Sequence, residues 1–253
     1  MKFEEVVRVI SQTEISEGIY DMWLETENIA VNAVPGQFVS VYTKDASKLL
    51  PRPISICEVS GKKLRLVYRV VGGGTTEFAT YREGDTVRIL GPIGNGFPLD
   101  AGSRAILIGG GIGIPPMLEL AKRYTGEKNI VVGYRNKDTF LDNELSANGM
   151  VTIATDDGSL GIHGTVIDAI RKAGITGDVI FACGPTPMLR AVRQYAEENN
   201  IEAYVSLEEK MACGVGACLA CVCKTSGVDS HSHVHNARIC KDGPVFNAKE
   251  VEL

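Results

Sequence analysis

Four cysteines late in the chain have a spacing that suits a metal cluster. Cys213, Cys218 and Cys221 follow a C-x4-C-x2-C pattern, Cys240 is a distant fourth, and Cys223 is left over. This spacing is typical of one class of 2Fe–2S site, in which four thiolates hold two irons. Glycine and alanine between the cysteines allow the loop to wrap a cluster and aim backbone N–H groups at its sulfurs. We therefore expect the four cysteines to be cluster ligands.

A structural zinc site is the alternative interpretation of the same cysteines, because Cys218-x2-Cys221 alone is compatible with one. Structural zinc usually takes its ligands in two closely spaced pairs, so the isolated Cys240 fits zinc poorly. Three alternate histidines could also coordinate a metal, or simply lie in a solvated loop: His231, His233 and His235.

Two motifs in the first third of the chain could bind a flavin nucleotide. Arg52-Pro53-Ile54-Ser55 begins an expected strand, and Gly72-Gly73-Gly74-Thr75-Thr76 leads into an expected helix. An arginine can clamp a pyrophosphate, and a glycine-rich turn before a helix offers N–H groups to the same anion. Ser55 could donate a hydrogen bond to a flavin ring nitrogen. Either motif alone is equally compatible with an ordinary strand start or turn.

A glycine-rich segment at residues 109–116 (GGGIGIPP) follows an expected strand and opens a helix. Glycines at this place let a strand end approach a pyrophosphate. The segment reads G-x-G-x-x-P from Gly111 through Gly113, and so departs from the usual G-x-G-x-x-G. The acidic residue that would hold a ribose is replaced by Tyr134-Arg135-Asn136-Lys137. Because Arg135 could meet a 2′-phosphate, NAD and NADP are not distinguished.

A second candidate nicotinamide element is Cys183-Gly184-Pro185, which ends another expected strand. It would lie at the carboxyl edge of a parallel sheet, where open α/β sheets bind ligands. Cys183 could be an inert buried thiol, since free cysteine is among the most buried residue types. Its fixed place at a strand end favours a role beside the nicotinamide.

The elements that must position these motifs fall into three parts. Short β-rich runs separated by turn residues predict a small closed barrel with one helix from about 75 to 82. The expected strands are residues 6–10, 19–24, 37–42, 54–59, 64–71 and 86–90. From about residue 103, apolar runs alternate with helical patterns, which predicts a parallel sheet covered on both faces. These runs are 105–108, 130–132, 151–154, 179–182 and 203–205, and the helices are 117–124, 140–147, 165–172 and 188–198. Regular patterning is expected to stop after Leu207.

Composition excludes several other classes of protein. Of the 253 residues 44% are hydrophobic and 23% are charged, so a sizeable core can form. The net charge of −5 offers no basic excess for nucleic acid. An acidic start is unlike a signal peptide, and no uncharged stretch reaches the ~20 apolar residues of a membrane span. We expect a cytoplasmic protein, away from membranes, whose cysteines are not in disulfides.

Taken together, the motifs resemble the ferredoxin-reductase superfamily: a flavin barrel with R-x-x-S and G-x-x-T, then a nicotinamide domain with G-x-G-x-x-P and C-G-P. With the cysteine segment, the chain resembles the family of electron-transfer subunits of type B dihydroorotate dehydrogenase. The resemblance spans nearly the whole chain. Its most specific stretches are residues 52–55 (RPIS), 91–97 (GPIGNGF) and 211–218 (MACGVGAC). Ile54 stands where the superfamily usually has an aromatic residue, as in this family.

The resemblance implies a fold of a six-stranded antiparallel flavin-binding barrel (1–98), a parallel-sheet nucleotide-binding α/β domain (99–207) and a C-terminal 2Fe–2S segment (208–253). It implies that FAD is contacted by Arg52, Pro53, Ile54, Ser55, Val67, Tyr68, Arg69, Gly74 and Thr75. Gly111, Gly113 and residues 183–185 would serve NAD. No residue of this chain would be catalytic toward dihydroorotate.

The resemblance also implies a partner. An FMN-containing dihydroorotate dehydrogenase catalytic subunit would pass electrons through 2Fe–2S and FAD to NAD+ in pyrimidine biosynthesis, in a heterotetramer with two of each subunit. Two alternatives remain. One is a related FAD/2Fe–2S reductase module of a hydrogenase or ferredoxin:NADP+ transhydrogenase. The other is a zinc-binding, nucleotide-sensing protein without redox activity.

Overall fold

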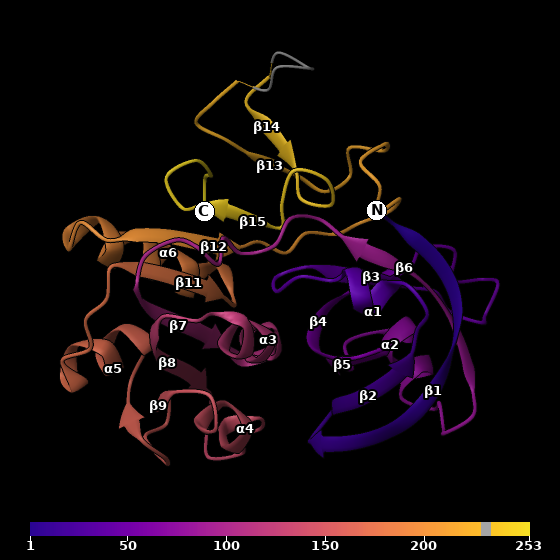
Figure 1. Ribbon diagram of the computed structural model, residues 1–253, viewed down its shortest axis with the longest axis horizontal. Helices are drawn as coiled ribbons and strands as arrows, with labels where there is room; N and C mark the ends of the chain where they lie inside the picture. The colour runs from indigo at the N-terminus through magenta and orange to yellow at the C-terminus, as the bar shows by residue number, and fades with distance from the viewer. Residues whose placement is uncertain (229–233) are drawn as a thin grey trace.

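The computed structural model describes residues 1–228 and 234–253, which form three parts (Figure 1). A closed barrel lies on one side, a sheet with helices lies on the other, and the cysteine-rich segment lies across the top of both. This architecture confirms the expected fold class.

The barrel is antiparallel, with the strand order β1-β2-β5-β4-β3-β6. Its strands are β1 (Phe3–Ser16), β2 (Ile19–Glu25), β3 (Phe38–Val41), β4 (Arg52–Ser60), β5 (Lys63–Arg69) and β6 (Thr86–Ile93). Each corresponds to a run predicted from the sequence. The strands form because successive side chains point to opposite faces. On β3, for example, Val39 and Val41 enter the barrel core, whereas Phe38 joins a different apolar cluster outside it.

Two short helices interrupt the barrel strands. The helix expected from about 75 to 82 is α2 (Gly73–Phe78), which ends earlier than predicted. The other, α1 (Ile29–Asn32), was not predicted, because four residues are too few to show a helical period. Its Ile29 and Ala30 are buried in the barrel core.

The second part is a seven-stranded sheet in the order β10-β9-β8-β7-β11-β12-β15. The strands are β7 (Arg104–Gly110), β8 (Glu127–Tyr134), β9 (Met150–Thr155), β10 (Ile162–His163), β11 (Val179–Cys183), β12 (Glu202–Ser206) and β15 (Val245–Asn247). The helices are α3 (Pro115–Arg123), α4 (Asp142–Ser146), α5 (Val166–Ala173) and α6 (Thr186–Glu198), with the single 3-10 turn η1 (Gly111–Gly113).

Both faces of this sheet are buried, which explains its continuous apolar strands. On β7, Ile106 and Ile108 pack into a cluster with side chains of α5 and α6, whereas Ala105 and Leu107 pack with α3 and α4. Helix α3 also packs directly against β4 of the barrel. Figure 1 shows α3 and α4 between the sheet and the barrel. The sheet is therefore joined to the barrel through one helical face.

The expectation that regular structure stops after Leu207 was wrong. The cysteine segment contains the hairpin β13 (Val222–Lys224) and β14 (Asn236–Arg238), and β15 adds to β12 at the sheet edge. These strands have three residues each, too few for a readable alternation. The β12–β15 pairing is antiparallel, so the sheet is parallel except at this edge.

Candidate cofactor sites

Strands β4 and β5 separate at the residues expected to bind flavin. Their pairing ends at Ile56↔Leu66, beyond which residues 52–55 pair only with β3 and residues 67–69 only with β2. Backbone N–H and C=O groups along this gap lack a ladder partner, and such groups require one. The structure thus brings the Arg-Pro-Ile-Ser motif and the predicted segment of the next strand to the two sides of one gap.

The side chain of Tyr68 does not face this gap. It is 1% exposed inside the barrel, where its hydroxyl donates to Gln12 Oε1 at 3.0 Å and its ring stacks on Tyr20. Only the backbone of Tyr68 is left to meet a ligand in the gap. Val67, which precedes it on the opposite face, belongs to the cluster that contains the side chains of α3.

Arg52 and Gly74, predicted to share a pyrophosphate, are in contact. A Cβ atom on Gly74 would collide with the Arg52 guanidinium group, so only glycine lets that side chain lie across the turn. Thr75 holds the turn itself: its hydroxyl accepts from Val71 N at 2.9 Å and donates to Gly72 O at 3.0 Å. The Thr75 side chain therefore shapes the candidate anion-binding turn through its bonds to the backbone.

The two predicted nicotinamide elements meet at the carboxyl edge of the sheet. Cys183 at the end of β11 pairs with Gly109 of β7. A Cβ atom on Gly113 would lie 2.5 Å from the Cys183 carbonyl carbon and 2.6 Å from the Gly184 nitrogen. Only glycine fits there, which is a physical reason for the glycine-rich turn. Pro185 follows as the N-cap of α6.

Cys183 is a neutral thiol at physiological pH. Burial raises its pKa to about 12, against a smaller opposing effect of a hydrogen bond with Ser206. A thiol in this state is a packing group and a weak donor, because nucleophilic cysteines need a lowered pKa.

Arg69 connects the flavin and nicotinamide sides. A Cβ atom on Gly111 would lie 3.8 Å from Arg69 Nη2, so this β5 side chain extends to the glycine-rich turn. The candidate flavin gap and the candidate nicotinamide turn therefore face one another across the barrel–sheet boundary.

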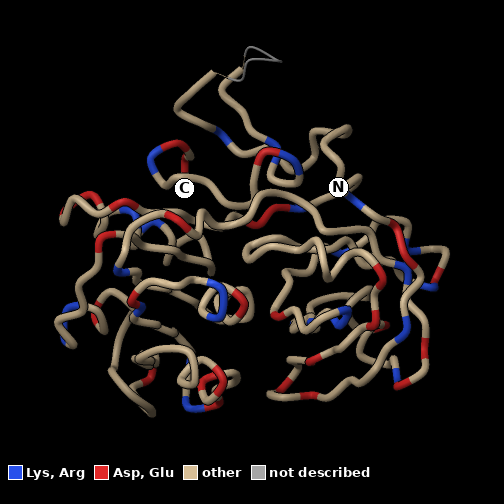
Figure 2. The backbone as a smooth tube through the Cα atoms, in the orientation of Figure 1, with Lys and Arg blue, Asp and Glu red and all other residues tan. Residues whose placement is uncertain are grey.

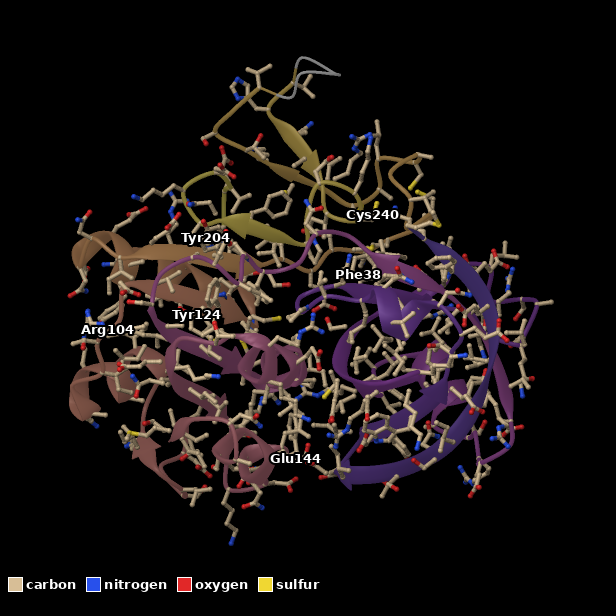
Figure 3. All side chains as sticks on the ribbon, in the orientation of Figure 1. Phe38, Arg104, Tyr124, Glu144, Tyr204 and Cys240 are labelled. Carbon is tan, nitrogen blue, oxygen red and sulfur yellow. The ribbon has the colours of Figure 1, made fainter. Side chains whose placement is uncertain are left out.

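The same boundary contains an ion-pair network that the sequence did not reveal. Arg65 of β5 is 6% exposed and binds Asp21 through Nε at 2.9 Å and Nη2 at 2.8 Å. It also binds Glu58 of β4 at 3.0 Å and Glu144 of α4. Figure 3 labels Glu144 where α4 faces the barrel, and Figure 2 shows acidic and basic residues together on α3 and acidic residues on α4. These residues are not related by any local sequence spacing, so the network can be identified only from the tertiary structure.

A second missed residue is Glu119 of α3, which is 3% exposed. Its Oε2 accepts a hydrogen bond from the backbone nitrogen of Val59 at 3.0 Å, which ties the helix to β4. Burial raises the pKa of Glu119, with Val59 and the nearby Arg123 acting in the opposite direction.

The four predicted cluster ligands differ in burial. Cys221 and Cys240 are 2% and 0% exposed, Cys213 is half-buried, and Cys218 is exposed. The backbone amide of Ile239 donates to Cys221 O at 2.9 Å, which places Cys240 beside that residue. All seven cysteines are free thiols.

The four thiols influence one another in two pairs. Cys218 lowers the pKa of Cys213, and Cys221 raises the pKa of Cys240. Burial and the effect of Cys221 raise the pKa of Cys240 to about 12. Two pairs of thiols suit two irons with two thiolates each. Within the described residues, no group of three or more His, Cys, Asp or Glu side chains is arranged around one point.

Backbone amides already point at one of these sulfurs. Val215 N and Ala217 N donate to Cys213 Sγ at 3.4 and 3.3 Å. Burial alone would raise the pKa of Cys213, but backbone donors and Cys218 lower it to about 6. Gly214 and Gly216 have positive φ values of 66° and 88°, a conformation that glycine adopts readily. The loop therefore favours a thiolate.

Arg238 of β14 holds the cysteine loop and was not singled out from the sequence. Its Nε binds Asp242 at 3.0 Å, and its Nη1 donates to Gly216 O at 3.3 Å. The i,i+4 spacing of Arg238 and Asp242 is a possible sequence signal, but it has this meaning in helices, and this segment is a turn.

A buried hydroxyl also points at the loop. Ser40 of β3 is 1% exposed, and its Oγ has no hydrogen-bond partner in the described part of the chain. A Cβ atom on Gly214, next to Cys213, would lie 2.8 Å from this oxygen. Leaving a buried hydroxyl unpaired costs about 1–3 kcal/mol. Paired thiols, inward amides and this hydroxyl together fit a 2Fe–2S cluster.

The remaining predicted metal candidates have weaker support. His231 and His233 lie outside the described residues. The backbone carbonyl of His235 accepts a hydrogen bond from Thr225 N at 3.1 Å. Cys223, half-buried on β13, has its pKa raised to about 11 by burial.

In the described ranges, no helix has the length and apolar character needed to cross a membrane.

Comparison with known proteins gives the family. A family described as the iron–sulfur cluster binding domain of dihydroorotate dehydrogenase B matches residues 208–252. The dihydroorotate dehydrogenase B (NAD(+)) electron transfer subunit of Geobacillus sp. (strain WCH70) is 43% identical over 100% of both chains. The subunit of the same name from Bacillus caldolyticus is 46% identical over 98% of both chains.

Solved structures agree with this assignment. The NADH-dependent reduced ferredoxin-NADP oxidoreductase superposes with a TM-score of 0.88 at 29% identity, covering 98% of this chain and 90% of that one. A ferredoxin NADP+ reductase from Neisseria gonorrhoeae with bound FAD and NADP shares the fold, with a TM-score of 0.64 at 16% identity over 78% and 91% of the two chains. Identity over the full length decides the family: this chain belongs to the dihydroorotate dehydrogenase B (NAD(+)) electron transfer subunits.

Proposed function

We propose that this chain carries electrons from a dihydroorotate-oxidising partner subunit, through a 2Fe–2S cluster and FAD, to NAD+ in pyrimidine biosynthesis. When bound, FAD supplies the junction chemistry, because a flavin exchanges electrons singly with a cluster and as a hydride with nicotinamide. The chain is thus an oxidoreductase subunit, and the oxidation of dihydroorotate belongs to its partner.

One structural observation carries this proposal. Ser40, which touches the cysteine loop, pairs directly with Pro53 of the flavin motif across β3 and β4. Neighbouring strands lie about 4.8 Å apart, so the cysteine loop is one strand away from the candidate flavin gap. On the other side of the gap, Arg69 extends to the nicotinamide turn at Gly111. This packing supports the order cluster, flavin, nicotinamide.

We assign the roles by part. Residues 1–98 bind FAD through Arg52, Pro53, Ile54 and Ser55, with the gap, Arg69 and the Gly74–Thr75 turn. Residues 99–207 bind NAD at Gly111, Gly113 and the Cys183-Gly184-Pro185 edge. Residues 208–253 would hold the cluster through Cys213, Cys218, Cys221 and Cys240, whose thiols influence one another.

The partner we propose is an FMN-containing catalytic subunit, two copies of each chain forming a heterotetramer in the cytoplasm. Three apolar side chains around the cysteines are exposed, as a subunit interface requires: Val215, Leu219 and Val222. Met211, in the same segment, packs against the core. Seven free thiols suit a reducing compartment.

The test is co-purification with a dihydroorotate dehydrogenase catalytic subunit, followed by an assay of dihydroorotate:NAD+ activity. The isolated chain should reduce artificial dyes with NADH, because its flavin and nicotinamide sites are self-contained, and should not oxidise dihydroorotate. Recovery of a hydrogenase or transhydrogenase subunit instead would favour the related reductase module, which the 29% identity to the ferredoxin-NADP oxidoreductase keeps as a second candidate. A colourless purified protein would favour zinc.

A further inference from the structure

The Ser40 hydroxyl is buried in a place that regular barrel packing does not explain. Its neighbours on β3, Val39 and Val41, face the barrel core, so Ser40 faces outward with Phe38. Phe38 belongs to the apolar cluster that also contains Cys221 and Cys240, and Figure 3 labels Phe38 and Cys240 at this junction. A polar group has thus been placed where barrel and cysteine segment make an otherwise apolar contact.

The cysteine loop lies against this hydroxyl. A Cβ atom on Gly214 would meet Ser40 Oγ at 2.8 Å and the Ile93 side chain at 3.7 Å. Gly214 follows Cys213 directly, and the amides of Val215 and Ala217 converge on the Cys213 sulfur. Ser40 therefore lies on the barrel side of the loop that we propose holds the cluster, and its Oγ has no acceptor in the described residues.

We propose that Ser40 donates a hydrogen bond from its hydroxyl to a sulfur of the 2Fe–2S cluster, and so raises the reduction potential of that cluster in this chain. The proposal rests on the proposed cluster site. A barrel residue outside the cysteine segment would then help to set the reduction potential of the cluster.

The direction follows from electrostatics. Taking up one electron adds one negative charge to the cluster and its sulfurs, with no bond formed or broken in the protein. A donated hydrogen bond stabilises the more negative form more strongly, and hydrogen bonds to sulfur are one of the factors that set iron–sulfur potentials. Removing the hydroxyl should therefore shift the potential to a more negative value. The buried position strengthens the effect, because a low local dielectric screens it less.

The experiment uses the full chain in complex with its catalytic subunit. The midpoint potential of the cluster is measured by redox titration followed by electron paramagnetic resonance, in the unmodified protein and in Ser40→Ala. We expect a more negative cluster potential in Ser40→Ala, an unchanged FAD potential, and unchanged iron and sulfide content. Pulsed resonance after exchange into D2O should show one fewer strongly coupled exchangeable proton. Thr26→Val is the control, because it removes a buried barrel hydroxyl that bonds to Ala30 and Lys62.

A second pair of variants protects the test against poor cluster loading in Ser40→Ala. Ser40→Thr and Ser40→Val have the same shape and differ only in the hydroxyl, so the valine variant should have the more negative potential. Equal potentials within either pair, or a shift to a more positive value, would overturn the proposal for Ser40 alone. An unmodified complex without a cluster signal would instead contradict the proposed function.

Discussion

The barrel meets the nucleotide-binding sheet and the cysteine segment in two different ways. Against the sheet it uses regular elements joined by charge: α3 packs on β4, Glu119 binds Val59, and Arg65 binds Glu144 of α4. Against the cysteine segment it uses apolar side chains and an irregular loop with Gly214 and Gly216 at positive φ. The first junction is a fixed frame, and the second is a loop that closes on its ligands.

This difference separates two tasks. Hydride exchange between flavin and nicotinamide needs two ring systems held in a set geometry, and a rigid junction provides it. The cluster must be wrapped by thiols from distant positions and must also approach another subunit. A short glycine-containing loop with exposed Val215 and Leu219 suits that task. Damage to one junction should therefore leave the other working.

The largest expected effect is at the cluster. Cys221→Ser should abolish the iron–sulfur absorbance while FAD stays bound, because the flavin residues lie on barrel strands. Cys223→Ser is the matched control on the same hairpin and should keep the full spectrum. Absorption spectra with iron, sulfide and flavin analysis make the measurement. If the Cys223 variant lost the iron–sulfur absorbance and the Cys221 variant kept it, our ligand set would be wrong.

The next largest effect is expected on FAD binding by the barrel. Arg52→Ala removes the charge that lies across Gly74, and a hydrogen bond to a charged group contributes about 1.5–3 kcal/mol. FAD affinity should fall by about 10- to 100-fold, at ~1.4 kcal/mol per decade, with cluster content unchanged. Fluorescence titration of the flavin-depleted chain measures it. Arg8→Ala, at an exposed ion pair with Glu25, should bind FAD normally. Normal FAD binding by a folded Arg52 variant would remove Arg52 from the site.

A smaller effect is expected at the loop surface. Leu219 is 61% exposed with a φ of 58°, a backbone region that aspartate tolerates better than leucine. Leu219→Asp should weaken association with the catalytic subunit by about 10-fold, as expected for a buried charge without a partner costing about 1–3 kcal/mol. NADH-dependent dye reduction should be unaffected. Met150→Asp is the control, because Met150 is 72% exposed on β9, away from the cysteine segment. Unchanged assembly would move the interface elsewhere.

The smallest effect concerns pH and the charged junction. Because the carboxyl is buried, the pKa of Glu119 in the folded chain lies above its ordinary value of 4.5. Ionisation therefore costs stability, and this cost grows as pH rises from below 4.5 through the raised value. Glu119→Gln should flatten that part of the pH profile of unfolding by urea. The exposed Glu83→Gln should leave it unchanged, and a Glu119→Gln profile as steep as the unmodified one would contradict the assignment.

The sequence predicted the structure correctly where a segment has a clear hydrophobic pattern or a recognisable motif. The barrel strands were predicted because alternation on a half-buried strand is a strong local signal, and the buried sheet strands because they are continuously apolar. The motif glycines were also found from sequence, and the structure adds the reason at Gly74 and Gly113, where a Cβ atom would strike Arg52 or the Cys183 backbone.

Residues whose role depends on distant partners were not found. Arg65 binds Glu144 across 79 positions, and Ser40 meets Gly214 from another part of the chain. Met211 packs against the core from the irregular cysteine segment, a contact that no local pattern indicates. Such roles are set by tertiary packing, which leaves no local spacing to read.

The β12–β15 pairing has a consequence for how the chain is made. β12 carries an unpaired edge until residues 245–247 fold back onto it, and the cysteines precede those residues in the chain. Bare sheet edges are templates for aggregation. During synthesis, the β12 edge is therefore covered only after the cysteine segment has folded across the top of the molecule. Iron starvation should then reduce the soluble yield of this protein, beyond any loss of electron transfer.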